Sequence, residues 1–206
     1  MGEELGRIDK PSVESFGEER KLFVIPLLFR GDDAPVEYLE KYDLYWQQVG
    51  EHLSRLEESL GRVQRVYHES LAAGGEDGLT ILEKLNAGSC SIAREKCQNG
   101  ALLEATEDGE LAEESMDWER CLLLGFMSEK VARMVSDLYV EASSRRYEHI
   151  ARRIDETLGA GEKGILFIGE RHRLQFPKNM QIFSVSPPAL DQIHRWLRER
   201  LETKAD

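Results

Sequence analysis

The sequence predicts an α/β fold, a single three-layer domain with a mostly parallel sheet of about five strands and helices on both faces. Three observations favour this class. Short apolar segments of strand type alternate with longer segments of helical periodicity. The 206 residues suit one domain, and the hydrophobic fraction of 41% is enough for a packed core. No run approaches the roughly 18–20 apolar residues that span a bilayer.

The first expected elements are a tail and a buried strand. Residues 1–20 are polar and acidic, so we expect a flexible acidic N-terminal tail and a single α/β domain over 21–206. The tail shows no signal peptide, and we therefore expect a cytoplasmic protein. The continuous apolar run over 21–29 predicts a strand buried on both faces. Pro26 opposes this placement, because proline donates no ladder hydrogen bond and favours an edge strand.

A helix over 36–60 follows, and it is the clearest element of the chain. Its apolar residues are spaced alternately by three and four positions, which is a heptad seam. The seam could pack the helix onto its own sheet or join two protomers as a homodimer, and we favour the first interpretation. The seam consists of Leu39, Tyr42, Trp46, Val49, Leu53, Leu56 and Leu60.

The middle of the chain is expected to add two strands and three helices. The segment 62–70 indicates a short strand, and residues 78–98 indicate a helix. A third strand is expected over 101–106, followed by an acidic helix over 109–124. A serine N-cap then opens a long helix over 128–158. The buried stripe of that helix is expected to consist of Val131, Val135, Leu138, Ala142, Ile150, Ile154 and Leu158.

The last quarter of the chain predicts two further strands and a final helix. The run GILFIGE over 164–170 is the strongest strand signal, and residues 180–186 predict a fifth strand. Ser186 then caps a helix whose first turn holds a proline pair. The apolar stripe of this helix is expected at Leu190, Ile193, Leu197 and Leu201.

The net charge of -12 is unevenly distributed. Residues 1–144 contain 15 basic and 30 acidic residues, whereas residues 145–200 contain 11 and 7. An acidic chain binds phosphate backbones poorly, so we expect no nucleic-acid partner. We also expect no membrane partner, because no apolar run is long enough. The basic final quarter is suited to a small anionic ligand.

Two features resemble chemical motifs but have structural explanations. Residues 159–164 match the letters of a dinucleotide-binding glycine motif, yet they follow a helix and precede a strand. The true motif follows a strand and opens a helix, so these glycines end a helix instead.

The cysteines Cys90, Cys97 and Cys121 fit neither a disulfide framework nor a zinc motif, and we expect structural thiols.

Ionisable residues follow four of the five expected strands. The carboxyl ends of parallel strands meet at one edge of the sheet, where ligands of open α/β sheets bind. His68 and Glu69 end the second strand, and His172 follows the fourth. Such side chains could act as general acid and base or hold a divalent metal, the one cofactor that we consider. The expected metal ligands are Glu104, Asp108, Glu170 and His172.

A short C-terminal region resembles a known group of proteins. The helix over 145–154 leads through a glycine turn into GILFIGERH over 164–172. This resembles the erythromycin-esterase, ChaN and TraB-like group, in which an R-x-x-x-[IM]-A-x-x-I helix leads to a strand closing with G-x-x-H. The resemblance implies functional roles for Arg146, Gly169 and His172. The chain lacks the group's second G-E-x-H motif. Residues 175–200 also resemble segments of small uncharacterised bacterial proteins, a similarity that carries no activity.

Two hypotheses about function follow from these patterns. The first is a polar, hydrolase-like site at the carboxyl edge of the sheet, dependent on a metal if one binds there. Its catalytic candidates are His68, Glu69, His172 and Arg146. The second is a non-catalytic binding or scaffold protein that uses the helices over 39–60 and 109–124 as partner surfaces. The sequence alone does not decide whether the protein is an enzyme.

Overall fold

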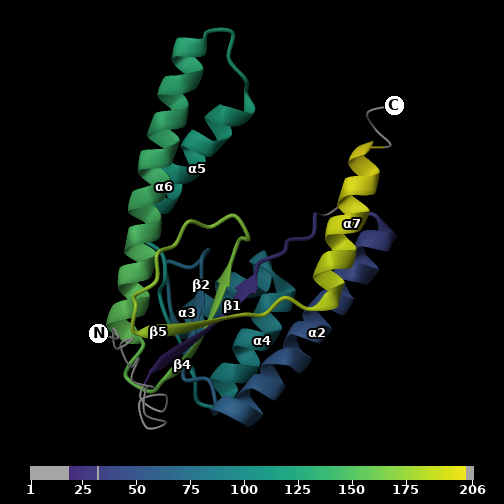
Figure 1. Cartoon of the computed structure of the whole chain (residues 1–206), viewed down its shortest axis with the longest axis vertical. Helices are drawn as coiled ribbons and strands as arrows, with labels where there is room; N and C mark the ends of the chain where they lie inside the picture. Colours follow the sequence, from purple (N-terminus) through teal and green to yellow (C-terminus); the bar gives the residue numbers. More distant parts are fainter. Residues whose placement is uncertain (1–18, 32, 203–206) are drawn as a thin grey trace, which may run out of the picture.

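The computed structural model describes residues 19–31 and 33–202 and contains a five-stranded parallel sheet (Figure 1). The strand order is β3-β2-β4-β1-β5, and every neighbouring pair is parallel. The α/β class is therefore confirmed. Most of the expected tail, residues 1–18, lies outside the described residues. The strands are β1 (Arg20–Pro26), β2 (Arg65–His68), β3 (Leu102–Leu103), β4 (Lys163–Ile168) and β5 (Met180–Ser184).

Two strands differ from their predicted form. β1 lies inside the sheet between β4 and β5, and Pro26 is tolerated there because it is the last residue of the strand. β3 has two residues instead of six. The chain leaves β2 after Glu104, because the backbone N–H groups of Thr106 and Glu107 both donate to the Leu71 carbonyl, at 2.9 and 2.8 Å. This early departure decides which carboxylates reach the carboxyl edge.

The described residues form six helices, which correspond to the predicted helices with some changes of bounds. The expected helix over 78–98 is two helices, because the Asn86 side chain accepts a hydrogen bond from the Ser89 N–H and starts a new helix. Ser128 caps the long helix as predicted. The helices are α2 (Val36–Leu60), α3 (Gly75–Leu85), α4 (Ala87–Gln98), α5 (Gly109–Leu123), α6 (Glu129–Thr157) and α7 (Pro188–Glu202).

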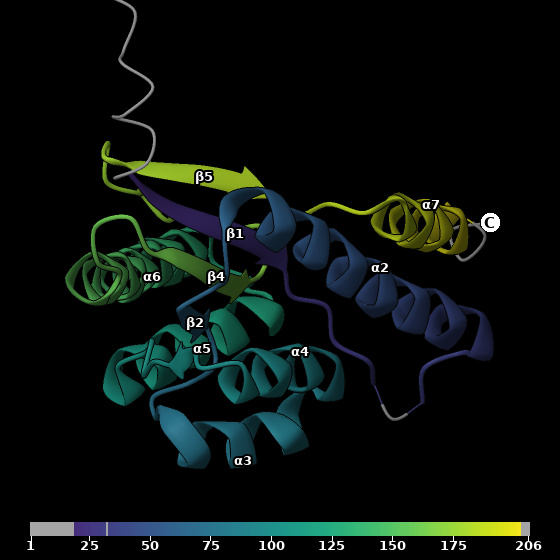
Figure 2. The same cartoon turned by 90° about the horizontal axis from the view of Figure 1, so that it is seen from below.

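The sheet separates two hydrophobic cores, so the molecule has three layers. Alternate residues of β1 face opposite sides: Phe23 belongs to the larger core and Leu22 to the smaller one. The larger core contains side chains of α2, α3, α4 and α7, and the smaller core is covered by the second half of α6. Figure 2 shows the strands between α6 on one side and α2 and α4 on the other.

The heptad seam of α2 packs into the chain's own core. Its central residues Tyr42, Trp46, Val49 and Leu53 are buried within the larger core. The chain itself therefore covers the centre of the seam, as the favoured interpretation expects, and a homodimer through this helix stays a prediction. Gly88 of α4 allows a close approach to this helix, since a Cβ there would lie 2.4 Å from the Trp46 ring.

Helices α5 and α6 form a hairpin that projects beyond the carboxyl edge of the sheet (Figure 1). The apolar stripe in the second half of α6 is buried as predicted, at Ile150 and Ile154. In the first half, however, Val131 and Leu138 are exposed, because α6 has left the sheet there and packs against α5. The single buried residue of α5 is Ser115. No helix of the described chain is long and apolar enough to cross a membrane.

Candidate functional site at the carboxyl edge of the sheet

The carboxyl edge of the sheet lies between two projecting arms. The α5–α6 hairpin rises on one side and α7 on the other (Figure 1). The segment that follows β4, residues 169–179, crosses the space between them. Helix α6 contributes Arg146 to this edge. This residue lies between the projecting half of the helix and the half whose apolar stripe is buried. The edge therefore collects side chains from β2, the β3–α5 loop, α6 and the segment after β4.

Arg146 joins two of these elements through an ion pair with Glu107. The Arg146 Nε donates to both carboxylate oxygens of Glu107, at 3.0 and 3.1 Å, and its Nη2 contacts the same carboxylate. Nη2 also donates to the Glu69 backbone oxygen at 3.0 Å. The Glu107 side chain is 2% exposed and that of Arg146 is 17% exposed. The pair is therefore a buried, bidentate ion pair that fixes α6 against the ends of β2 and β3.

The Glu69 carboxylate occupies a second fixed position at this edge. Its Oε1 accepts a hydrogen bond from the Gly169 N–H at 2.8 Å. Gly169 permits this contact, because a Cβ at that residue would lie 3.2 Å from Oε1. The other oxygen, Oε2, accepts no hydrogen bond from the described residues. Glu69 therefore links the ends of β2 and β4, and no described residue donates a hydrogen bond to its Oε2.

Burial changes the protonation of both carboxyl groups. Burial raises the pKa of Glu107 to about 7 against the lowering effect of Arg146, and the Glu69 charge adds to the rise. Burial also raises the pKa of Glu69, while Arg146 and the Gly169 N–H act in the opposite direction. Two carboxylates beside one guanidinium would leave an uncompensated negative charge in a buried place. Glu69 and Glu107 therefore keep a proton to a higher pH than an ordinary glutamate does, which is what a general acid or base near neutral pH needs.

His68 lies away from this group, contrary to the sequence hypothesis. It faces the larger core, where its ring lies beside Phe167 at a centroid distance of 5.7 Å. Its Nδ1 accepts from the Ser70 N–H at 3.1 Å, and its Nε2 lies 3.2 Å from the Ser89 hydroxyl. Burial lowers the pKa of His68 to about 3. With both nitrogens occupied and the ring neutral, His68 is a structural residue and leaves no free nitrogen for a base or a metal.

His172 belongs to the segment after β4, as expected, but has different neighbours. Its Nδ1 accepts from the Leu174 N–H at 3.3 Å, and its ring meets Phe176 edge-on with centroids 6.1 Å apart. Burial lowers the pKa of His172. Among the described residues, no hydrogen bond or ion pair joins it to Glu69, Glu107 or Arg146. Its catalytic role stays a prediction.

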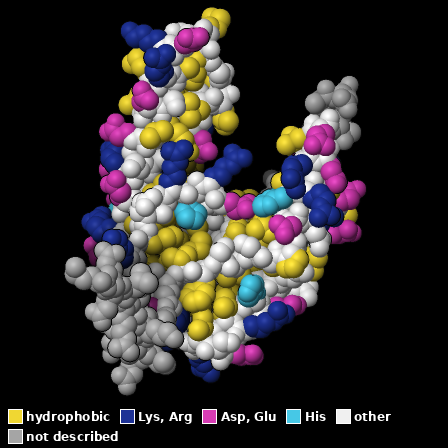
Figure 3. Space-filling model, viewed as in Figure 1, with side chains coloured by type: hydrophobic (Ala, Val, Ile, Leu, Met, Phe, Trp, Pro, Cys, Tyr) yellow, Lys and Arg dark blue, Asp and Glu magenta, His cyan; other side chains and the backbone are white. Residues whose placement is uncertain are grey.

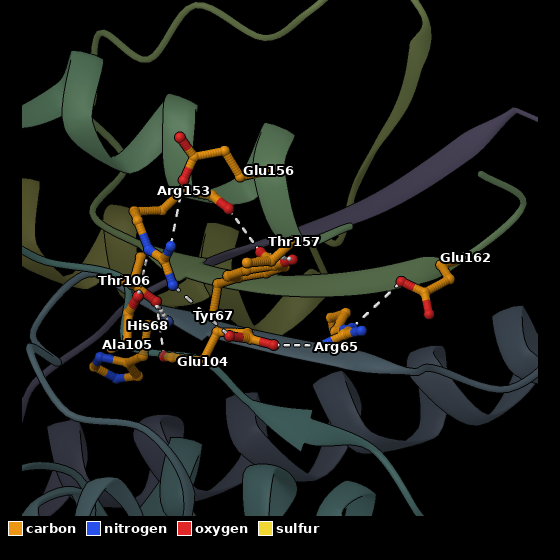
Figure 4. A network of polar contacts seen from close by, with 10 residues as sticks. All are labelled: Arg65, Tyr67, His68, Glu104, Ala105, Thr106, Arg153, Glu156, Thr157 and Glu162. Atoms are coloured by element: carbon orange, nitrogen blue, oxygen red, sulfur yellow. Dashed lines mark hydrogen bonds and ion pairs between the residues drawn. The ribbon is translucent and has the colours of Figure 1, made fainter. Parts of the chain in front are cut away.

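The four expected metal ligands point to separate partners. The Glu104 carboxylate turns back along the sheet and pairs with Arg65 at the start of β2, within the network of Figure 4. Asp108 caps α5 by accepting from the Leu111 N–H at 3.1 Å. Glu170 pairs with His194 of α7 at 2.9 Å. In the part of the chain that the structure describes, no three His, Cys, Asp or Glu side chains are grouped to hold a metal. The expected ligand set therefore does not assemble.

Glu107 is a site residue that is missing from the candidates chosen from the sequence. It follows the expected third strand, but the candidates taken from this segment were Glu104 and Asp108. A signal was present: an Asp directly before a helix over 109–124 is a typical N-cap, which commits Asp108 to the helix. Glu107 is then the remaining carboxylate of that loop.

An open groove lies beside the buried group. It has a volume of about 440 Å³ and runs between α6 and the segment after β4. Arg171 and Arg173 line it together with Tyr139 and Tyr147 of α6. The guanidinium of Arg146 lies 5.8 Å from the centre of the Tyr147 ring, so Tyr147 is shared between the groove and the buried ion pair. The groove is thus adjacent to Arg146 and offers two cations and one carboxylate, that of Glu148.

A second groove continues from the first towards α7. Arg171 also lines this space, which has a volume of about 610 Å³ and is bordered by His194, Arg195 and Arg198. Figure 3 shows Lys and Arg side chains in the hollow between the hairpin and α7. The hairpin and α7 therefore enclose a basic surface beside the buried carboxyl groups of Glu69 and Glu107.

Comparisons of the chain with protein-family models, with curated proteins and with solved structures found no match.

Proposed function

We propose that this protein is a hydrolase-like enzyme that acts on a small anionic substrate by general acid–base chemistry at the carboxyl edge of its sheet. The observation that carries this proposal is the buried group of Glu69, Glu107 and Arg146. It combines two carboxyls with raised pKa values and a fixed guanidinium beside an open groove. Perturbed titratable groups beside a cavity are typical of catalytic sites.

Each residue has a distinct proposed role. Glu69 is the general base, because no described residue donates to its Oε2 and its position is fixed by Gly169. Glu107 and Arg146 act as a positioning pair that sets the charge around Glu69. Arg171 and Arg173 bind the anionic part of the substrate in the groove. The free thiols of all three cysteines support a cytoplasmic, reducing location.

Ligand binding tests the groove. We expect phosphate and carboxylate compounds to raise the melting temperature of the wild type in a thermal-shift assay. The double substitution Arg171→Ala and Arg173→Ala should remove this effect, because it removes both groove cations. The matched control is Arg55→Ala, which changes an exposed arginine on α2. An equal shift in the groove variant and the wild type would contradict the assigned substrate site.

Catalysis tests the base. We expect the wild type to release p-nitrophenol from at least one member of a panel of p-nitrophenyl carboxylic and phosphoric esters. Glu69→Gln should lower kcat by about 10²–10⁴-fold, the usual contribution of a general base. Glu104→Gln is the matched control, since that carboxylate pairs with Arg65 outside the group. Full activity in Glu69→Gln, or no turnover across the panel, would count against the proposal.

A further inference from the structure

The far half of the α5–α6 hairpin carries apolar side chains that no other described element covers. Leu123 and Leu124 are each 82% exposed, and Met127 is fully exposed. Figure 3 shows hydrophobic side chains along the length of this hairpin. We call this set the distal face. It consists of Met116, Leu123, Leu124, Met127, Val131, Met134 and Leu138, all exposed.

The spacing of the distal face is that of a helix-packing surface. Val131, Met134 and Leu138 follow one another by three and four positions along α6, which places them in one stripe. Only one residue of α5, Ser115, is buried. Two antiparallel helices standing alone cover one side of each other, and packing against a second pair into a four-helix bundle covers the rest.

The charges of the hairpin are divided along its length. The tip, residues 119–135, contains three basic and two acidic residues. The base of the hairpin, residues 109–118 and 136–145, contains one basic and six acidic residues. The hairpin is therefore self-complementary: the tip of one copy is attracted to the base of another when the two copies run in opposite directions.

We propose that two copies of this chain associate through their distal faces as an antiparallel four-helix bundle, with each tip against the partner's base. A membrane surface fits the observations less well. Asp117, Glu129 and Asp137 lie within the same stretch of the hairpin and would have to enter the bilayer with it. The stripe also continues down α6 to Leu138, well beyond the tip. This proposal is independent of the catalytic site.

Sedimentation velocity of the full chain tests the association. We expect the wild type to shift from monomer to dimer as its concentration rises. The double substitution Met134→Glu and Leu138→Glu should weaken dimerisation at least about tenfold, because it places charges in an apolar interface. Circular dichroism should show wild-type helicity, since both side chains are exposed in the single chain. The matched control is Leu201→Glu, an exposed leucine of α7 outside the distal face. A wild type that stays monomeric, or a double variant that dimerises normally, would overturn the proposal.

Charge reversal tests the antiparallel orientation. One variant carries Lys130→Glu and Arg133→Glu at the tip, and a second carries Glu110→Lys and Glu113→Lys at the base. For the base variant to reverse its sign, it also carries Asp137→Lys and Glu141→Lys, which change the base from a net charge of -5 to +3. Each variant alone should be monomeric, because its tip and base then have the same sign of charge. An equimolar mixture should form heterodimers, because both tip-to-base contacts join opposite charges. Failure of the mixture to dimerise would overturn the antiparallel arrangement.

Vesicle binding tests whether the distal face binds a lipid surface instead of a second copy. We expect no cosedimentation of the wild type with phosphatidylcholine vesicles, with or without phosphatidylglycerol. Cosedimentation that is lost in the Met134→Glu and Leu138→Glu variant would assign the distal face to a lipid surface and overturn the dimer.

Discussion

The two halves of α6 share one sequence pattern but have opposite environments. In the second half, Ile150 and Ile154 are completely buried against the sheet. In the first half, Val131, Met134 and Leu138 continue the same apolar spacing but are exposed on the projecting hairpin. Arg146 lies between the two halves and binds Glu107 at the carboxyl edge. One helix thus carries a structural surface, a candidate site residue and an uncovered apolar face.

This difference shows what amphipathic periodicity specifies. The pattern predicts that a helix face will be apolar, and it does not say what covers that face. For the second half of α6 the cover is the chain's own sheet. For the first half, we propose, it is a second copy of the chain. Substitutions along α6 should distinguish the two environments. The same side-chain change should lower the free energy of unfolding more in the buried half than in the exposed half.

The largest difference is expected between two adjacent arginines. Arg146→Leu should lower the free energy of unfolding by about 3–5 kcal/mol, because it leaves Glu107 buried without its cation. Arg145→Leu should cost at most about 1 kcal/mol, because the Arg145–Glu114 pair is exposed. Urea denaturation at neutral pH measures both. Equal losses of unfolding free energy in Arg146→Leu and Arg145→Leu would contradict the distinction between the buried and the exposed arginine.

The next difference concerns the apolar stripe itself. Ile154→Ala should cost about 2–5 kcal/mol, because it opens a cavity in the smaller core. Leu138→Ala should change the stability of the monomer by no more than about 0.5 kcal/mol, because that side chain is exposed. The comparison is made by denaturation at low protein concentration, where dimerisation does not contribute. A large loss for Leu138→Ala in the monomer would mean that the hairpin is packed more closely than its exposure indicates.

Sequence patterns predicted the fold more completely than the site. The alternation of apolar segments is enough to indicate a parallel α/β sheet, and Ser128 marks the start of α6. The early end of β3 depends on hydrogen bonds to the Leu71 carbonyl, a contact between distant loops that no local pattern contains. With the chain turned there, Glu107 meets Arg146 at the edge, while Glu104 pairs with Arg65.

The histidine assignments show the same limit. Both faces of β2 are buried, so the apolar pattern does not say which side of the sheet each residue faces. His68 and Glu69 are neighbours, yet His68 bonds Ser89 of α4 on one side while Glu69 meets Arg146 and Gly169 at the edge. The carboxyl edge, Arg146 and Glu69 could be inferred from sequence, whereas the choice between adjacent side chains required the strand register.

A smaller effect is expected in the pH dependence of stability. The pKa of Glu107 is about 7 in the folded chain and 4.5 in its ordinary state, so between these values the folded chain binds more protons than the unfolded chain. The contribution of Glu107 to stability is therefore present below pH 4.5 and is lost as pH rises to about 7. The loss is on the order of 1–3 kcal/mol. Glu107→Gln should flatten this part of the stability profile, and Glu104→Gln should leave it unchanged. Identical profiles for Glu107→Gln and the wild type would contradict the assignment.

The most direct test of the acid–base site is a ¹³C NMR titration of the glutamate side-chain carboxyl carbons. We expect one carboxyl resonance to titrate near pH 7 in the wild type and to be missing in Glu107→Gln. Glu104→Gln should retain it, because Glu104 lies outside the buried group. If every glutamate carboxyl titrated in its ordinary range near 4.5, then Glu69 and Glu107 would hold no proton near neutral pH. The central claim would then be wrong.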